Sequence, residues 1–315
     1  MHKHKSWVIA HIASLYYVDN LTQEMIAEQM QVSRSTISRA LLDARKNGIV
    51  EIHINYPFQQ VEKLETAICK KFGLQAARVL KASKEWTYGD VLEGLGILAA
   101  QYFQTIVRPN SLVVISSGNS VYHTVKALEE QKLDLDVIQV MGVPSSINPV
   151  IDGPELAQLL VQRLGGFATY VQAPFVVKNT EIYQKLMEEE PFEAIINRVK
   201  QANCALVGVG TVDPLSSSLS RTGFTVESLE ELMRCGAVGE ISGQTFDRFG
   251  QMVTAEKAQK AVSIELKYLK DIPCVIGIAG GLAKVEAIGG ALAGKLLDVL
   301  VTDQDVAEAI LDMNP

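Results

Sequence analysis

Apolar residues recur at helical spacing in three successive segments of the first 48 residues. In residues 6–17 they come every three or four positions, which predicts a first helix. Thr22 and Ser33 are suitable N-caps for a second and a third helix, and the third is expected to end at Gly48. Gln31 occupies the turn between them, where many helix-turn-helix proteins place glycine because the backbone needs a positive φ. The pattern predicts a helix-turn-helix.

A short alternating segment follows these helices. Val50, Ile52, Ile54 and Tyr56 alternate with polar residues, a period of two that is typical of a strand. A strand at this place would form a wing beside the third helix. We therefore predict that residues 1–56 form a winged helix-turn-helix domain.

The exposed side of the predicted third helix carries cations and hydroxyl groups. Such a helix fits the major groove of DNA, where arginine can donate two hydrogen bonds to guanine and serine or threonine can contact a base or a phosphate. The glutamine that starts the second helix is placed to bind a phosphate. The candidate DNA-binding residues are Gln23, Ser33, Arg34, Ser35, Thr36, Ser38 and Arg39. They would also suit the solvated face of an ordinary helical hairpin, but the turn and the following wing favour DNA binding.

An apolar stripe of helical spacing runs through residues 57–73. Val61, Leu64, Ile68 and Phe72 are separated by three, four and four positions, so we predict a linker helix here. Two uses of the stripe remain open. It can pair with the same helix of a second copy, because helix-turn-helix proteins commonly read two half-sites, or it can pack on the domain that follows.

In residues 74–315 short β-rich segments alternate with helix-length segments. This alternation is typical of βαβ units around a parallel sheet, so we predict a Rossmann-like α/β domain. The expected strands are residues 112–115, 137–140, 205–209, 275–278 and 299–301. The expected helices are residues 88–107, 120–130, 155–164, 227–234 and 285–297. Ligands of such sheets bind beyond the carboxyl ends of the strands.

Small residues, a lysine and an acid follow several of these strands. Backbone N–H groups converge at the helix start in residues 116–120, which suits a phosphate. Gly281 permits close approach, Lys284 can supply a cation, and Asp247 can accept hydrogen bonds from sugar hydroxyls. The candidate effector-binding residues are Ser116, Ser117, Gly118, Asn119, Ser120, Asp247, Gly281 and Lys284. Each loop alone is also a common tight turn, but all are expected to open on one crevice.

The net charge of −7 is unevenly distributed along the chain. Residues 1–56 hold six Lys and Arg against five Asp and Glu, whereas the remainder holds 23 against 31. An acidic surface repels nucleic acid. A basic surface for DNA is therefore expected only on the N-terminal domain, with its cations gathered in residues 34–46.

Cofactor and metal chemistries lack their sequence signatures. Asp213 replaces the third glycine of a dinucleotide fingerprint, and Leu296 replaces the Ser or Thr of a nucleotide-binding loop. The four cysteines are dispersed, with no histidine at ligand spacing, so we expect no metal site and no cofactor. No segment has the length of a membrane helix and the start lacks an apolar signal region, so we expect a cytoplasmic protein with no membrane partner.

Motifs along nearly the whole chain form a specific combination. In the N-terminal domain they are Tyr16-Tyr17, Leu21-Thr22-Gln23, residues 32–39 and Gly48-Ile49-Val50. In the following domain they are residues 207–210, residues 236–241, Ala279-Gly280-Gly281 with Lys284, and residues 300–303. With these motifs the chain resembles the SorC family of bacterial transcriptional regulators, sometimes grouped as SorC/DeoR-like.

The resemblance implies a sugar-binding domain of the ribose-phosphate-isomerase-like fold, a phosphorylated sugar as effector, and a homodimer or homotetramer on operator DNA. Matched by position, the family's phosphate loop falls on Ser117, Gly118, Asn119 and Ser120, and further effector contacts fall on Lys284 and Asp247. Gln244 stands where an arginine is common in the family.

These observations predict a DNA-binding transcriptional regulator rather than an enzyme. We expect a repressor whose C-terminal domain binds a phosphorylated sugar or sugar-like metabolite that alters operator binding. The alternative is a sugar-phosphate isomerase fused to a DNA-binding head, with Asp247 or Glu240 as the base and Lys284 holding the phosphate.

Overall fold

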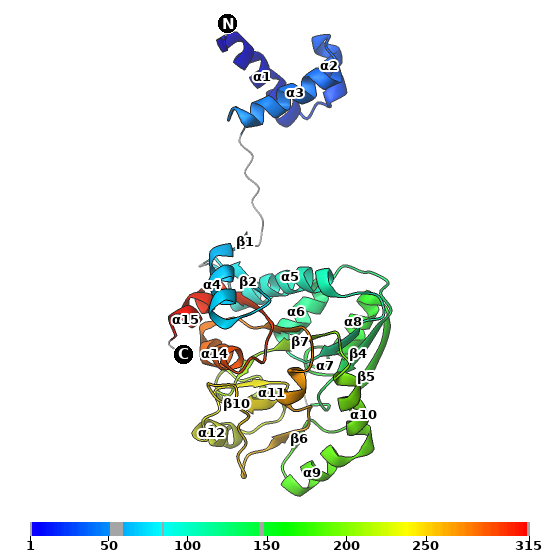
Figure 1. The fold of residues 1–315 in the computed structure, drawn as a ribbon, viewed down its shortest axis with the longest axis vertical. Coiled ribbons are helices and arrows are strands. Elements are labelled where there is room, and N and C mark those ends of the chain that lie inside the picture. Colours follow the sequence, from blue (N-terminus) through cyan, green and yellow to red (C-terminus); the bar gives the residue numbers. More distant parts are fainter. Residues whose placement is uncertain (1, 51–58, 84, 145–147, 314–315) are drawn as a thin grey trace. The chain divides into compact units, whose positions relative to one another are not determined.

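The computed structural model describes residues 2–50, 59–83, 85–144 and 148–313. The chain forms two compact units, Met1–Pro57 and Phe58–Pro315, here called the head and the body (Figure 1). None of the described helices combines the length and the apolar character needed to cross a membrane.

Three helices form the head: α1 (His2–Tyr17), α2 (Gln23–Met30) and α3 (Arg34–Lys46) (Figure 1). Thr22 caps α2 and Ser33 caps α3, each by accepting a hydrogen bond from a backbone N–H of the first turn. Ile26 and Ile37 are the most buried large side chains of the small core between the helices. The predicted helices and both caps are confirmed. The predicted wing falls on residues 50–56, of which 51–56 lie outside the described part of the chain.

Gln31 ends α2 in the left-handed region, with φ of 52° and ψ of 43°. Its N–H donates to the carbonyl of Glu28 at 3.2 Å, and the Val32 N–H donates to the carbonyl of Ala27 at 3.0 Å. These bonds turn the chain sharply toward α3. The predicted positive φ at Gln31 is confirmed, and it lets a residue other than glycine make the turn at a modest cost in backbone strain.

The body is built on a sheet of eight described strands in the order β1-β2-β13-β12-β7-β3-β4-β5. Adjacent strands are parallel except for β1 with β2. The strands are β1 (Gln59–Gln60), β2 (Ala76–Lys81), β3 (Leu112–Ile115), β4 (Leu135–Gln139), β5 (Gly166–Tyr170), β7 (Cys204–Gly208), β12 (Val275–Ile278) and β13 (Val299–Asp303). The predicted Rossmann-like parallel sheet is confirmed.

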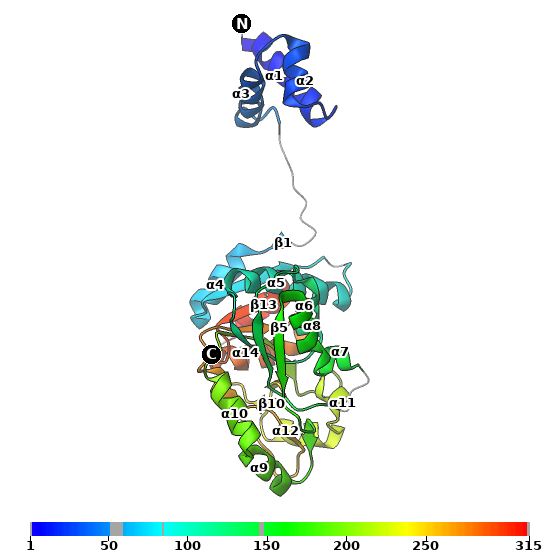
Figure 2. The same ribbon diagram turned by 90° about the vertical axis from the view of Figure 1, so that its right-hand side faces the viewer.

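Two layers of helices cover the sheet (Figure 2). One face packs against α5 (Tyr88–Ile106), α6 (Asn119–Ala127) and α8 (Glu155–Leu164). The other face packs against α4 (Glu62–Phe72), α10 (Glu190–Val199), α13 (Leu266–Leu269), α14 (Val285–Ala293) and α15 (Gln304–Asp312). Neighbouring strand residues alternate between the two cores, so that Val113 belongs to the first and Val114 to the second.

The crossover direction reverses between β3 and its neighbour β7. From β3 the chain proceeds to β4 and β5 on one side, whereas from β7 it proceeds to β12 and β13 on the other. Loops that leave the carboxyl ends of such a strand pair diverge and leave a crevice, which is where open α/β sheets bind ligands.

A smaller lobe lies beyond the carboxyl ends of the strands (Figure 1). It contains a three-stranded sheet of β8 (Gly210–Thr211), β9 (Gly239–Ile241) and β10 (Gln244–Phe246), and a pair of β6 (Val176–Val177) with β11 (Lys260–Ala261). Its helices are α9 (Thr180–Glu188), α11 (Leu219–Thr222) and α12 (Val226–Arg234), and a 3-10 turn, η1, spans Leu282–Lys284. The short helix α7 (Pro149–Asp152) packs instead against α6 and α8. This lobe forms the second wall of the crevice.

The apolar stripe of helix α4 packs against the core of the body. Ile68 is fully buried in the body core, and Val61, Leu64 and Phe72 pack against that core. The Lys71 ammonium donates to the carbonyls of Ile310, Leu311 and Met313, which end α15. Of the two uses left open by the sequence, the structure shows packing on the body.

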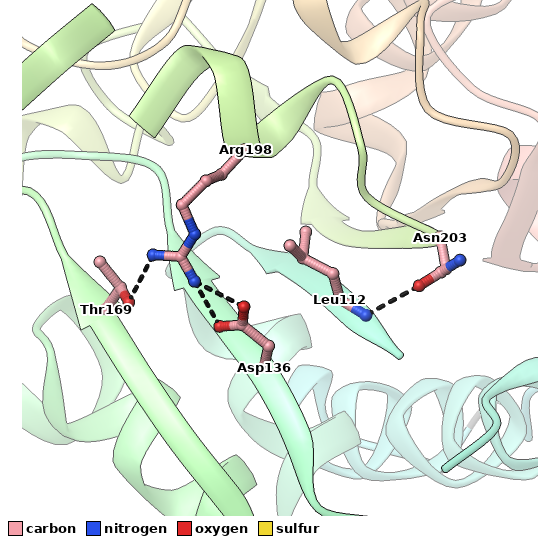
Figure 3. Close-up of polar contacts among 5 residues, drawn as sticks. All are labelled: Leu112, Asp136, Thr169, Arg198 and Asn203. Carbon is pink, nitrogen blue, oxygen red and sulfur yellow. Dashed lines mark hydrogen bonds and ion pairs between the residues drawn. The ribbon is translucent and has the colours of Figure 1, made fainter. Parts of the chain in front are cut away.

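An ion pair joins α10 to the sheet (Figure 3). The Arg198 guanidinium donates to both carboxylate oxygens of Asp136, at 2.6 and 2.5 Å, and to the Thr169 hydroxyl at 2.9 Å. In the same layer the Leu112 N–H donates to the Asn203 side chain at 2.8 Å. These contacts fasten α10 and the residue before β7 to β3, β4 and β5, and those to β3 and β4 lie at the amino ends of these strands.

Gln31→Val should destabilise the head by about 1–2 kcal/mol relative to Gln31→Gly, because a β-branched side chain is strained at positive φ. Hydrogen exchange of the α2 and α3 amides in the full chain measures this difference. Gln29→Val, at an exposed helical position of α2, is the matched control and should cost about 0.5 kcal/mol. Equal losses from the two valine variants would contradict the assignment of strain to Gln31.

Arg198→Ala should lower the free energy of unfolding of the body by about 1–3 kcal/mol, because it leaves a half-buried carboxylate at Asp136 without its donor. Urea unfolding of the full chain measures the loss. Lys185→Ala breaks the exposed pair with Glu181 and should cost less than about 1 kcal/mol. A loss at Arg198 no larger than that at Lys185 would show that the pair of Figure 3 does not stabilise the body.

Candidate functional site

The predicted DNA-binding residues gather at the start of α3 and on its outer side. Ser33, Arg34, Ser35, Thr36 and Arg39 are exposed, whereas Gln23 and Ser38 are half-buried. The opposite side of α3 holds the buried Ile37, Leu41 and Ala44. The hydroxyls and cations of α3 therefore lie on the surface of the head, opposite its core.

Two contact sets order the start of α3. The Ser33 hydroxyl lies 2.8 Å from both the Ser35 and the Thr36 hydroxyl oxygens and accepts a hydrogen bond from the Thr36 N–H. The Arg34 Nε lies 2.9 Å from a carboxylate oxygen of Glu24, in the first turn of α2. At its other end α3 is tied to α1, because the Arg45 Nε donates to the Tyr17 hydroxyl at 3.0 Å.

In the body, a cavity of about 120 Å³ lies at the carboxyl ends of β3 and β7, where the crossover direction reverses. Among the predicted residues, Ser117, Gly118, Asn119, Ser120 and Lys284 line it. A larger cavity of about 340 Å³ lies within the smaller lobe, and none of the predicted effector-binding residues lines it. The first cavity is the candidate effector site because three strand-end loops meet there.

The loop after β3 places the start of α6 at the cavity. Gly118 adopts a φ of 115°, a conformation that L side chains rarely adopt, and α6 begins at the next residue. The first N–H groups of a helix have no partners within the helix and carry a partial positive charge. The Gly118 N–H is already engaged, because it donates to the carbonyl of Ile151 at 3.0 Å. The charge at the start of α6, from Asn119 onward, is of the kind that favours an anion.

The hydroxyls of Ser116 and Ser120 are engaged in holding the strand ends together. Ser116, at the end of β3, accepts a hydrogen bond from the Gly208 N–H of β7 at 3.0 Å. Ser120 donates to the carbonyl of Ile278 in β12 at 2.7 Å. Both residues are buried, and Ser116 does not line the cavity. The structure therefore does not bring Ser116 into the cavity lining; its hydroxyl joins the strand ends behind the site.

Lys284 brings a second positive group to the cavity. It ends the η1 turn that follows β12, and its Nζ lies 6.0 Å from the ring centroid of Tyr88, which also lines the cavity. The Gly281 N–H donates to the Asp303 carboxylate at 2.7 Å, so Gly281 anchors this turn and does not itself line the cavity. The position of Lys284 is compatible with its predicted role as a cation for an anionic ligand. Gly281 instead helps to hold the turn that carries Lys284.

Asp247 does not reach the cavity. Its carboxylate accepts hydrogen bonds from the Phe249 and Gln251 N–H groups, both at 2.9 Å, within its own turn. That turn packs closely against Gly290 of α14. The structure therefore does not bring Asp247 together with the predicted residues that line the cavity.

Glu240 supplies the acceptor that the sequence reasoning assigned to Asp247 as a sugar contact. It lines the cavity and is buried, and its carboxylate accepts from the Ser218 hydroxyl at 3.2 Å and from the Gly243 N–H at 2.8 Å. Desolvation raises the pKa of this carboxyl, and these two hydrogen bonds and the charge of Lys284 act in the opposite direction. The sequence analysis names Glu240 only as the base of the enzyme alternative. An acid within an otherwise apolar strand is nevertheless a signal of a buried polar site, because acids are rarely buried without a partner.

Two neighbours define the surroundings of Glu240. A Cβ on Gly210 would lie 2.1 Å from a Glu240 carboxylate oxygen, so a larger residue there would force the Glu240 side chain to move. The Ser242 hydroxyl is buried and, among the described residues, has no hydrogen-bond partner. The cavity therefore has cationic character near α6 and Lys284 and hydrogen-bonding groups near Glu240, Ser218 and Ser242. Such an arrangement can hold an anion joined to a hydroxylated carbon chain.

Comparison with known proteins places the chain in a family. Residues 56–312 match the model of the family described as "Putative sugar-binding domain". The Deoxyribonucleoside regulator of Bacillus subtilis is 31% identical over 313 residues, covering 99% of both chains. The Transcriptional regulator LsrR of Escherichia coli is 32% identical over 306 residues, covering 96% of this chain and 94% of LsrR.

Solved structures agree with these relatives. The full-length sorbitol operon regulator SorC from Klebsiella pneumoniae has a TM-score of 0.75 at 29% identity, covering 97% of this chain and 98% of SorC. A probable sor operon regulator from Shigella flexneri has a TM-score of 0.71 at 28% identity, covering 80% of this chain and 99% of its own. The chain belongs to the SorC family of transcriptional regulators, in which a DNA-binding head accompanies a sugar-binding domain.

Proposed function

We propose that this protein is a repressor that binds operator DNA through its head and releases it when the body binds a phosphorylated sugar or sugar-like metabolite. One observation carries the effector class. The start of α6 and Lys284 line the same cavity as the buried carboxylate of Glu240. A phosphate is attracted by a helix N-terminus and an ammonium group, and a carboxylate accepts hydrogen bonds from hydroxyls. A sugar phosphate carries both groups on one small molecule.

The residues of the head support operator binding. We propose Arg34 and Arg39 as base readers, Ser33, Ser35, Thr36 and Ser38 as base or phosphate contacts, and Gln23 as a phosphate contact. We propose that residues 1–56 bind DNA, that residues 57–73, which include α4, connect the two functions, and that residues 74–315 bind the effector. Because helix-turn-helix proteins commonly read two half-sites about 34 Å apart, we propose that a homodimer or homotetramer binds the operator.

Effector and operator sites lie in separate units, so the effector must act by shifting an equilibrium between assemblies that present the heads differently. Such coupling is typically worth about 1–3 kcal/mol. The effector supplies this energy only if it binds one assembly more tightly than the other. The relatives named as regulators of operons and of deoxyribonucleosides support this assignment.

An isomerase activity is the competing function, since Glu240 and Lys284 would be suitable as a base and a phosphate clamp. The relatives reported above are named as transcriptional regulators, which favours binding without conversion. A turnover assay over aldose and ketose phosphates separates the two functions, because a regulator binds such a compound and returns it unchanged.

Arg39→Ala should weaken operator binding by about 5-fold to 150-fold, corresponding to the loss of about 1–3 kcal/mol of base contact. Fluorescence anisotropy with labelled operator at fixed salt measures the change. Lys46→Ala, which removes a charge at the far end of α3, is the matched control and should have a smaller effect. Stabilisation of the body by sugar phosphates should be unchanged in both variants. Equal losses of operator affinity at Arg39 and Lys46 would contradict base reading by Arg39.

Lys284→Ala should abolish the response to effector and leave operator binding without effector intact. In the wild-type protein a sugar phosphate at a hundred times its dissociation constant should add about 2.7 kcal/mol of stability. A thermal-shift screen of phosphorylated sugars measures this gain, and Lys270→Ala, at an exposed position remote from the cavity lining, is the control. An undiminished gain in Lys284→Ala would remove Lys284 from the effector site.

A further inference from the structure

The head contains an ion pair at the start of α3, on the surface that we propose to face DNA. It joins Glu24, in the first turn of α2, to Arg34, the first residue of α3, with 2.9 Å between the Arg34 Nε and a Glu24 carboxylate oxygen. The side chains keep 58% and 68% of their surface exposed, respectively. Exposed pairs of this kind contribute little to folding. A carboxylate on a surface proposed to meet phosphates therefore calls for an explanation other than stability.

The pair engages one edge of the guanidinium. The plane of an arginine side chain carries five N–H donors, one on Nε and four on the two terminal nitrogens. The Glu24 carboxylate lies beside Nε, and within the described part of the head this ion pair is the contact that Arg34 makes, so its terminal N–H groups stay available to a ligand. Two parallel N–H donors are the arrangement that reads O6 and N7 of guanine in the major groove.

The position of Arg34 in the head also favours a contact with a base edge. The N-terminal residues of a recognition helix contact base edges, and Arg34 is the first residue of α3. A free arginine loses much rotamer freedom when it binds, and an arginine already held by a neighbour loses less. Glu24 in turn is fixed in the first turn of α2, which Thr22 caps.

We propose that Glu24 is a positioning residue that orients Arg34 to read a guanine in each operator half-site. The proposal rests on the proposed function, since it requires operator binding. Glu24 does not itself contact the guanine; it sets the plane and the direction of the guanidinium. Its effect is therefore expected at one base position and not on DNA affinity in general.

The test compares full-length wild-type protein with Glu24→Gln, Arg34→Ala and the double variant. Binding sites are first selected from random DNA with the wild-type protein. The affinity for each of the four bases at every position of the selected site is then measured by competition anisotropy. Glu28→Gln removes the same charge from an exposed position of α2 that forms no ion pair within the described part of the head, and serves as the control. Unchanged thermal unfolding verifies that each variant is folded.

We expect Arg34→Ala to abolish the preference for guanine at one position, and Glu24→Gln to reduce that preference at least fivefold at the same position. Affinity for non-specific DNA should be equal or higher in Glu24→Gln, because a negative charge is lost. The double variant should discriminate no worse than Arg34→Ala, and Glu28→Gln should match the wild type.

Three results would overturn the proposal while leaving operator binding in place. They are an undiminished guanine preference in Glu24→Gln, an equal change at all base positions, and a cytosine preference lost in Glu24→Gln but kept in Arg34→Ala, which would make Glu24 a base reader. A wild-type protein that selects no DNA sequence would instead refute the proposed function itself.

Discussion

The body depends on a constraint at the carboxyl ends of three neighbouring strands. β3, β7 and β12 must end in register for the cavity to exist, and two serine hydroxyls fasten them there. Ser116 joins β3 to β7, and Ser120 joins the start of α6 to β12. Because both hydroxyls are buried, losing either would leave a polar backbone group without its partner. These two hydrogen bonds therefore fix the positions of the loops that line the cavity.

The electrostatics of the cavity follow from this arrangement. Fixing the start of α6 places its partial positive charge at the cavity, and the turn after β12 adds the Lys284 ammonium. Opposing them is a carboxylate, Glu240, that burial alone would favour in its protonated form. Neutral donors from Ser218 and Gly243 stabilise its charged form. A ligand with a charged end and a hydroxylated end satisfies all of these groups at once.

Much of this was predictable from the sequence, and the exceptions have physical causes. Strands with continuous apolar runs, such as β3 and β12, were located because burial on both faces leaves such runs. β5 was missed because it begins with glycine and lies at the edge of the sheet, where its residues are partly exposed. Strands of two or three residues in the smaller lobe leave no periodicity to detect. Asp247 was misplaced because nearness to a strand end in sequence does not fix the direction of the following turn.

The proposed regulation requires that the cavity and the head share one equilibrium. Thermodynamic linkage requires that the effector and the operator change each other's affinity by the same factor. Isothermal titration of a sugar phosphate into the free protein and into the operator-bound protein measures this factor directly. The account predicts weaker effector binding to the operator complex, by about 5-fold to 150-fold, matching the loss of operator affinity at saturating effector. Equal effector affinity in the two states would contradict it.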